Sequence, residues 1–191
     1  MAKRTVALTE EQYKNIIETI KRGFVLDGKN YRPNERIATV LVVQANLGMR
    51  ISDILNLRLD SIIKNGNRYM LDIVEKKTQK PRTFTVPAEI YNYIKGYCFD
   101  NNIKATQKIF DVGIRAIQLH LQKVCKYLGY ENISTHSFRK FYATNVYIDS
   151  GYNVALVREL LQHADTSTTL KYIGISSKEV EEVINRNIRL I

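Results

Sequence analysis

The spacing of apolar residues in this chain is helical along most of its length and changes to alternation once. Apolar residues recur three and four positions apart after Thr9, after Asn34 and after Gly113, as on the buried face of a helix. Between Arg68 and Val86, short β-branched or aromatic runs take over. This pattern restricts the chain to an α+β fold that is mainly α-helical and carries one small sheet.

Capping signals and glycines indicate where the expected elements begin and end. Thr9 and Gln12 form a capping box, and Gly23 ends the first helix. A polar connection leads to a second helix that starts near Asn34 and stops at Gly48. Further helices are expected after Gly48 with a start at Ser52 or Asp53, from Pro87, between Gly113 and Gly129, from Ser137 to about Ser150, from Tyr152 or Asn153 to Gln162, and from Ser176.

The sheet is expected to have three antiparallel strands. They lie near Ser61–Ile63, over Tyr69–Val74 and over Arg82–Val86, with Asn65-Gly66 as the first turn. The second connection is rich in lysine. Cations on a hairpin tip are often only solvated charge that protects a sheet edge, but on a basic protein they also suit a nucleic-acid groove.

The net charge and the composition narrow the class of protein. The chain has 191 residues, enough for one domain with a proper core, and its 29 Lys and Arg against 19 Asp and Glu give a charge of +10. That surplus favours a polyanionic partner, nucleic acid before membrane. No apolar run approaches the roughly 18 residues of a membrane span, and no secretory signal opens the sequence. Two cysteines without metal-ligand spacing suggest reduced packing residues in the cytosol.

The stretch from Thr135 to Tyr172 collects the residue types that phosphoryl transfer to a protein nucleophile requires. His136 and Arg139 are one helical turn apart, so on a helix both can reach one ligand. The planar guanidinium fits two phosphate oxygens. His163 follows in a turn-rich, hydroxyl-rich segment, and Tyr172 is a possible covalent nucleophile. Singly, each histidine and tyrosine is better explained as a packing or surface residue; only the set carries weight.

A further arginine stands next to the expected short helix. Arg50 follows the glycine turn and can project into a cleft, although in isolation it is equally well explained as a surface cation. Asp53, three residues later, can hold a neighbouring basic group. The three histidines are 16 and 27 residues apart, which matches no usual zinc pattern, so no metal site is expected.

These residues, in this order, resemble the catalytic domain of the tyrosine recombinase (phage integrase) family. The similarity rests on Arg50 in GMRISDILNLRLDSI, a lysine in EKKTQKPRTFTVP, His136-Ser137-Phe138-Arg139, His163 in LLQHADTSTT, and Tyr172, and it extends from about Thr9 to the C-terminus. It implies the fold of that catalytic domain, with the small sheet on one edge. It also implies site-specific cutting and rejoining of DNA through a 3′-phosphotyrosine, without metal or high-energy cofactor.

The resemblance assigns a role to each residue. Tyr172 would attack the phosphate, Arg50 and Arg139 would clamp its oxygens, and His136 would act as base or donor. His163 would donate to the phosphate, and Asp53 would support the site from behind. A hairpin lysine would protonate the leaving 5′-oxygen; Lys77 is the first choice, with Lys76 and Lys80 as alternatives. DNA contacts are expected from Lys76, Lys80, Arg82 and Lys140.

The resemblance also sets expectations for the whole protein. Residues 1–191 would be a single catalytic domain without the N-terminal core-binding domain, either as a fragment or as an unusually short protein. The tail helix of 173–191 would be exchanged between subunits or packed on its own domain. The partner would be double-stranded DNA at a specific site, bound by a homo-tetramer that is monomeric when free, in the cytoplasm of a bacterium or phage host, near the nucleoid. A catalytically silent DNA-binding protein and a type IB topoisomerase or resolvase-like enzyme remain as alternatives.

Overall fold

The computed structural model describes residues 5–74, 79, 81–161 and 166–173. Within this part of the chain the secondary-structure elements follow in the order α1 (Glu10–Arg22), β1 (Phe24–Leu26), β2 (Lys29–Tyr31), α2 (Glu35–Leu47), α3 (Ile51–Ile54), the 3₁₀-helix η1 (Leu59–Ser61), β3 (Ile62–Asn65), β4 (Arg68–Val74), β5 (Pro81–Val86), α4 (Ala88–Asp100), α5 (Ile114–Leu128), α6 (Thr135–Asp149), α7 (Val154–Leu161) and α8 (Thr166–Ile173).

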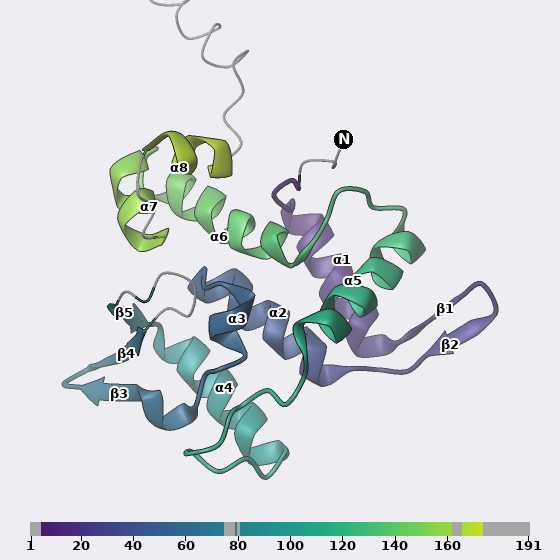
Figure 1. The fold of residues 1–191 in the computed structure, drawn as a ribbon, viewed down its shortest axis with the longest axis horizontal. Coiled ribbons are helices and arrows are strands. Elements are labelled where there is room, and N and C mark those ends of the chain that lie inside the picture. Colours follow the sequence, from purple (N-terminus) through teal and green to yellow (C-terminus); the bar gives the residue numbers. More distant parts are fainter. Residues whose placement is uncertain (1–4, 75–78, 80, 162–165, 174–191) are drawn as a thin grey trace, which may run out of the picture.

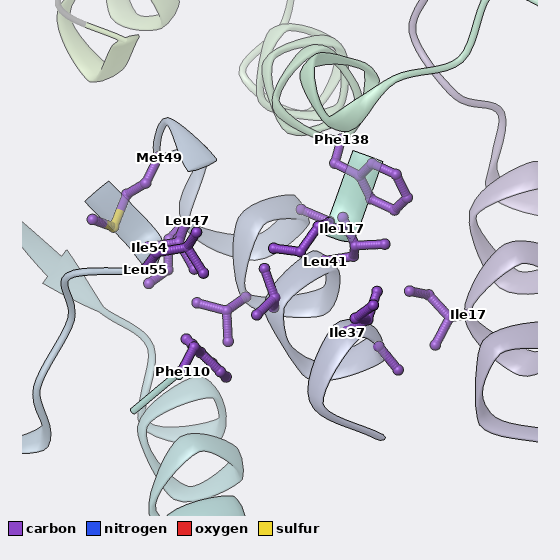
Figure 2. Close-up of a cluster of buried hydrophobic side chains, with 14 of the residues drawn as sticks. Ile17, Ile37, Leu41, Leu47, Met49, Ile54, Leu55, Phe110, Ile117 and Phe138 are labelled. Atoms are coloured by element: carbon purple, nitrogen blue, oxygen red, sulfur yellow. The ribbon is translucent and has the colours of Figure 1, made fainter. Parts of the chain in front are cut away.

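Helix α2 forms the centre of the main core. It packs against α1, α4 and α6, so it is surrounded by other elements (Figure 1). Buried side chains cover almost its whole circumference, which is why its sequence is apolar on all sides and not only along one stripe. Figure 2 shows Leu47, Met49 and Ile54 gathered at one end of this core, where α2 gives way to α3.

The three-stranded sheet agrees with the expectation from alternation. Its order is β3-β4-β5 with antiparallel pairing throughout, and Leu71 in the central strand pairs with Ile62 on one side and Phe84 on the other. Leu71, Ile62 and Val86 are buried, which anchors one face of the sheet to the main core. Residues 75–78 and 80 of the lysine-rich connection lie outside the described part.

Helices α6, α7 and α8 share a second, smaller core. Ala143, Val157, Leu161 and Ile173 are buried together, one or more from each helix. In Figure 1 these helices form a layer beside the α2–α3 region, and α6 contacts both groups. Helix α6 therefore joins the two cores.

Helices α6 and α8 differ from the sequence expectation. Helix α6 begins at Thr135, because Ser134 supplies a capping box with Ser137 that moves the start by two residues. The hydroxyl-rich residues from Thr166 onward form α8 and not a turn. Thr169 and Ile173, one turn apart, are buried against α6 and α7, so tertiary packing outweighs the weak helix propensity of Ser and Thr.

The connection between α1 and α2 contains a β-hairpin that sequence analysis treated as a polar loop. Asp27 and Gly28 both have positive φ, of 51° and 74°, which is the turn that a two-residue hairpin needs. The strands have three residues each, too few to reveal a period. The Phe24 ring stacks on Tyr31 at 4.7 Å, and the hairpin projects from the body of the molecule (Figure 1).

His120 of α5 lies against this hairpin. Its ring meets Phe24 and Tyr31 edge-on at 6.1 and 6.4 Å, and its buried Nε2 has no hydrogen-bond partner within the described residues. Desolvation lowers the pKa of His120 below the usual 6.5. The side chain therefore serves as a neutral packing residue between helix and hairpin.

This environment makes stability depend on pH in a known direction. The unfolded chain binds a proton at His120 more readily than the folded chain does, so the contribution of this residue is complete above pH 6.5 and is lost as the pH falls from there through the lower pKa of the folded state. We expect urea unfolding at several pH values to show this loss, and His120→Phe to have a flatter pH profile over that window. Parallel profiles for the two proteins would contradict it.

The two cysteines are free thiols in the main core. Burial raises the pKa of Cys125 to about 11 and also raises the pKa of Cys98 above its ordinary value. Because the thiolate is the reactive form, both residues act as small apolar packing groups. No described helix has the length and apolar character that crossing a membrane requires.

Candidate active site

The bend between α2 and α3 carries Arg50. Gly48 ends α2 in the left-handed conformation, with φ of 58°, and its N–H donates to Gln44 O at 3.0 Å. Arg50 then occupies the N-cap position of α3 with extended backbone, φ −67° and ψ 146°, and its side chain is partly exposed. The expectation of an arginine between a glycine turn and a helix start is confirmed, although the helix begins at Ile51.

The close approach of α6 explains why a glycine stands in this bend. A Cβ atom at Gly48 would lie 2.2 Å from Cδ1 of Tyr142, well inside contact distance. Together with the positive φ, this excludes other residues without a local shift. The ring of Tyr142 thus covers the residue two positions before Arg50.

Helix α6 presents His136 and Arg139 in different surroundings. The helical spacing expected for these two residues is confirmed, but only His136, in the first turn, is exposed. Arg139 is 1% exposed. Its Nη1 donates to Gly48 O at 2.5 Å and its Nη2 to Leu161 O at 2.8 Å.

These two hydrogen bonds connect three elements through one guanidinium. Gly48 stands two residues before Arg50, and Leu161, the last residue of α7, stands two residues before His163. The planar fork of an arginine can span two acceptors on separate elements, which a lysine ammonium cannot do with the same geometry. Arg139 thereby holds the segments that lead to two other candidate residues.

Asp53, three residues after Arg50 and within α3, is 5% exposed. The Ser52 hydroxyl donates to its Oδ1 at 3.4 Å. Asp53 also lines a cavity of about 470 Å³ together with Val74 and Gln79, the described residues that flank the lysine-rich connection. The described residues at the base of that connection therefore lie beside α3.

Lys140 does not take the position expected for a DNA contact. It is buried, and its Nζ donates to Thr5 O at 2.6 Å. This contact holds the segment before α1 against α6. The neighbouring Arg139, which belongs to the H-x-x-R motif, is buried as well. The position of Lys140 next to this motif therefore did not show whether its side chain is exposed.

Several candidate residues lie wholly or partly outside the described part of the chain. Lys76, Lys77, Lys80 and His163 lie outside it, as does the tail after Ile173. For Arg82 and Tyr172 only the backbone is described, in β5 and in the last turn of α8. Helix α8 packs on α6, so the backbone of Tyr172 belongs to a helix that contacts the one bearing His136 and Arg139.

Sequence analysis missed residues that shape this site without being reactive. Gln44 is 1% exposed, and its Nε2 donates to Met49 O at 3.3 Å. Gln44 and Tyr142 support the same bend from two helices. An amide among mostly apolar residues, in VLVVQANL, was the available signal for Gln44.

One protein-family model and several known proteins are similar in sequence to this chain. The family model described as "Phage integrase family" matches residues 6–179. A tyrosine recombinase XerA from Pyrococcus furiosus is 27% identical over 94% of this chain and 61% of its own length. A probable integrase/recombinase of Acholeplasma phage L2 is 30% identical over 69% of this chain and 46% of its own length. The chain thus spans about half to three fifths of the length of these relatives.

Solved structures share the fold. The catalytic domain of bacteriophage HP1 integrase superposes with a TM-score of 0.64 at 16% identity and covers 96% of both chains. The XerH site-specific recombinase, in a post-cleavage complex with its difH substrate, gives a TM-score of 0.66 at 18% identity over 96% of this chain and 53% of its own. The expected fold class, a mainly helical catalytic domain with a small antiparallel sheet, is confirmed.

Proposed function

Because the chain belongs to the phage integrase family, we propose that it is a site-specific tyrosine recombinase that cuts and rejoins DNA through a 3′-phosphotyrosine. The observation that carries the proposal is the guanidinium of Arg139 between the bend before Arg50 and the end of α7 before His163. Gly48 and Leu161, more than a hundred positions apart, are thereby both connected to α6, on which the helix of Tyr172 also packs.

The proposed reaction needs only these side chains and the DNA. The phenol oxygen of Tyr172 attacks the scissile phosphorus, the bond from phosphorus to the 5′-oxygen breaks, and Lys77 delivers a proton to that oxygen. His136 takes part as base or donor, and His163 donates to the phosphate. Arg50 and Arg139 stabilise the charge that grows on the non-bridging oxygens; one such preorganised donor is typically worth about 3 kcal/mol. A free 5′-hydroxyl from another strand then reverses the step and restores the phosphodiester.

The proposed partner is double-stranded DNA at a specific recombination site. The net charge of +10 supports a polyanionic partner, and the XerH structure holds its difH substrate. Lys76, Lys80 and Arg82 are the proposed contacts, whereas Lys140 is not retained. Relatives include archaeal and phage proteins, so we place the reaction on cytoplasmic chromosomal or mobile-element DNA.

The assembly follows from the chemistry. Exchange between two duplexes cuts four strands, so four nucleophiles are needed, and we propose a homo-tetramer on DNA that separates into monomers when free. Residues 1–191 would act as one catalytic domain. The segment 173–191 follows the nucleophile directly, so docking on a neighbouring subunit would couple one active site to the next.

Covalent trapping tests the proposal. The chain is mixed with nicked suicide duplexes of randomised sequence, in buffer with excess chelator, and protein–DNA species that survive denaturation are recovered and sequenced. A recombinase is expected to give an adduct at the DNA 3′-end that enriches one sequence and that is joined to a new strand when a 5′-hydroxyl is supplied. Specific binding without an adduct would favour a silent DNA-binding protein; relaxation of supercoils without a partner site would favour a topoisomerase.

A further inference from the structure

Two successive carbonyls precede Arg50, and each accepts a hydrogen bond from a buried side chain. Gly48 O accepts from Arg139, and Met49 O accepts from Gln44 at 3.3 Å. The donors come from different helices, α6 and α2. The peptide that leads into Arg50 is therefore held by side chains as well as by the helix end.

Gln44 is energetically unfavourable at this buried position. It is 1% exposed in a helix whose other core residues are almost all apolar, and its Oε1 has no hydrogen-bond partner within the described residues. A buried polar atom without a hydrogen-bond partner lowers the stability of the folded state. The single hydrogen bond from Gln44 to Met49 O offsets that loss at most in part. Stability alone therefore gives no reason to prefer glutamine here to an apolar residue of the same shape.

The conformation of Arg50 supplies a reason. Arg50 is extended, with ψ of 146°, and the next residue is already helical. Rotation of the peptide between Met49 and Arg50 would change the orientation of Arg50, the N-cap residue of α3. Because the guanidinium lies at the end of a long side chain, even a small rotation of the backbone would displace it considerably. The amide of Gln44 is fixed on α2, most of whose residues are buried, and its hydrogen bond to Met49 O opposes that rotation. The carbonyl that Gln44 holds belongs to the peptide immediately before the candidate phosphate clamp.

We propose that Gln44 is a positioning residue for Arg50: its buried amide fixes the Met49 carbonyl and thereby aims the guanidinium of Arg50 at the scissile phosphate. This inference rests on the proposed function and adds to it a residue that never touches DNA. A displacement of about 1 Å in a catalytic group can cost about a hundredfold in rate, so the effect falls on the chemical step and not on DNA binding.

Gln44→Met tests this role because methionine keeps the length of the side chain and removes the donor. Thr39→Val is the matched control: Thr39 is also a buried polar residue of α2, but its hydroxyl pairs with Tyr93 Oη at 3.3 Å, away from the bend. The duplex enriched by covalent trapping is the probe. Single-turnover cleavage, DNA affinity and thermal unfolding are measured for each variant.

For Gln44→Met we expect a cleavage rate constant at least about tenfold below that of the parent, with DNA affinity within about twofold and an unfolding temperature close to the parent's. Thr39→Val should cleave at the parent rate. In an Arg50→Lys background the same substitution should cost much less, because the residue through which it acts has already changed. If Gln44→Met does not unfold cooperatively, Gln44→Leu takes its place.

Three results separate failure of the inference from failure of the proposed function. If the parent protein cleaves DNA and a folded Gln44→Met variant cleaves it equally fast, only the positioning role of Gln44 is overturned. The same holds if the loss is undiminished in the Arg50→Lys background, since the amide would then act elsewhere. A parent that forms no covalent complex with any duplex of the randomised pool overturns the proposed function, and the inference with it.

Discussion

Tyr172→Phe is expected to abolish the covalent protein–DNA complex, reducing its rate of formation by at least about a thousandfold, to the background of the assay. Phenylalanine keeps the ring and removes only the phenol oxygen, which is the atom that would bond to phosphorus. The backbone of α8 is tied to α6 and α7 through Thr169 and Ile173, so the substitution should leave the fold intact. DNA affinity should also remain, because binding depends on the cationic side chains.

The measurement is the denaturation-resistant band with the enriched suicide duplex, together with a gel-shift of the intact duplex. Tyr152→Phe is the matched control: Tyr152 is 66% exposed, lies just before α7, and loses the same hydroxyl without any proposed role. A band that persists in Tyr172→Phe, or that disappears equally in Tyr152→Phe, would assign the nucleophile elsewhere. Loss of the gel-shift in Tyr172→Phe would indicate a folding defect.

Arg139→Lys is expected to reduce both stability and cleavage, which would distinguish it from every surface arginine. The guanidinium satisfies Gly48 O and Leu161 O at once, in a site that is 1% exposed. An ammonium cannot span both acceptors, so one buried carbonyl loses its donor. We expect the free energy of unfolding to fall by about 2–4 kcal/mol, as for other substitutions that strand buried polar groups.

The expected loss of cleavage is at least about a hundredfold, because Arg139 is a proposed phosphate clamp and also holds the segments that lead to Arg50 and His163. Urea unfolding and single-turnover cleavage, the latter at a temperature where the variant stays folded, measure the two effects. Arg158→Lys, on the exposed side of α7, is the control and should change neither. An Arg139→Lys protein that retains its stability and its cleavage rate would contradict both roles.

The expected helices and the small sheet depended on information close together in the sequence. Capping residues such as Thr9, Asn34 and Gly129 act within one turn, so the ends of α1, α2 and α5 could be predicted to within a residue or two. The β1–β2 hairpin escaped because three-residue strands show no period, and it is held by Phe24 and Tyr31 rings that stack across the pair. Helix α8 escaped because its stability comes from burial against α6 and α7.

For the candidate site, too, the sequence indicated some features and the tertiary structure others. Residue types and order pointed to Arg50, His136, Arg139 and Tyr172, since the chemistry of phosphoryl transfer selects them whatever the packing. Whether each side chain faces solvent or the interior could not be deduced from the sequence. Lys140 was expected to contact DNA and is buried, with its Nζ bonded to Thr5 O, and Gln44, for which no role was predicted, holds the bend through its amide.

By itself, therefore, the sequence determined which reactive groups the protein carries, the family to which it belongs and the order of most of its helices and strands. The tertiary structure alone decided which groups meet. Arg139 reaches Gly48 and Leu161 from 91 and 22 positions away, and hydrogen bonds over such separations leave no periodic trace in the sequence. Their partners are chosen when helices α2, α6 and α7 pack, because packing alone determines which buried carbonyl lies within reach of which donor.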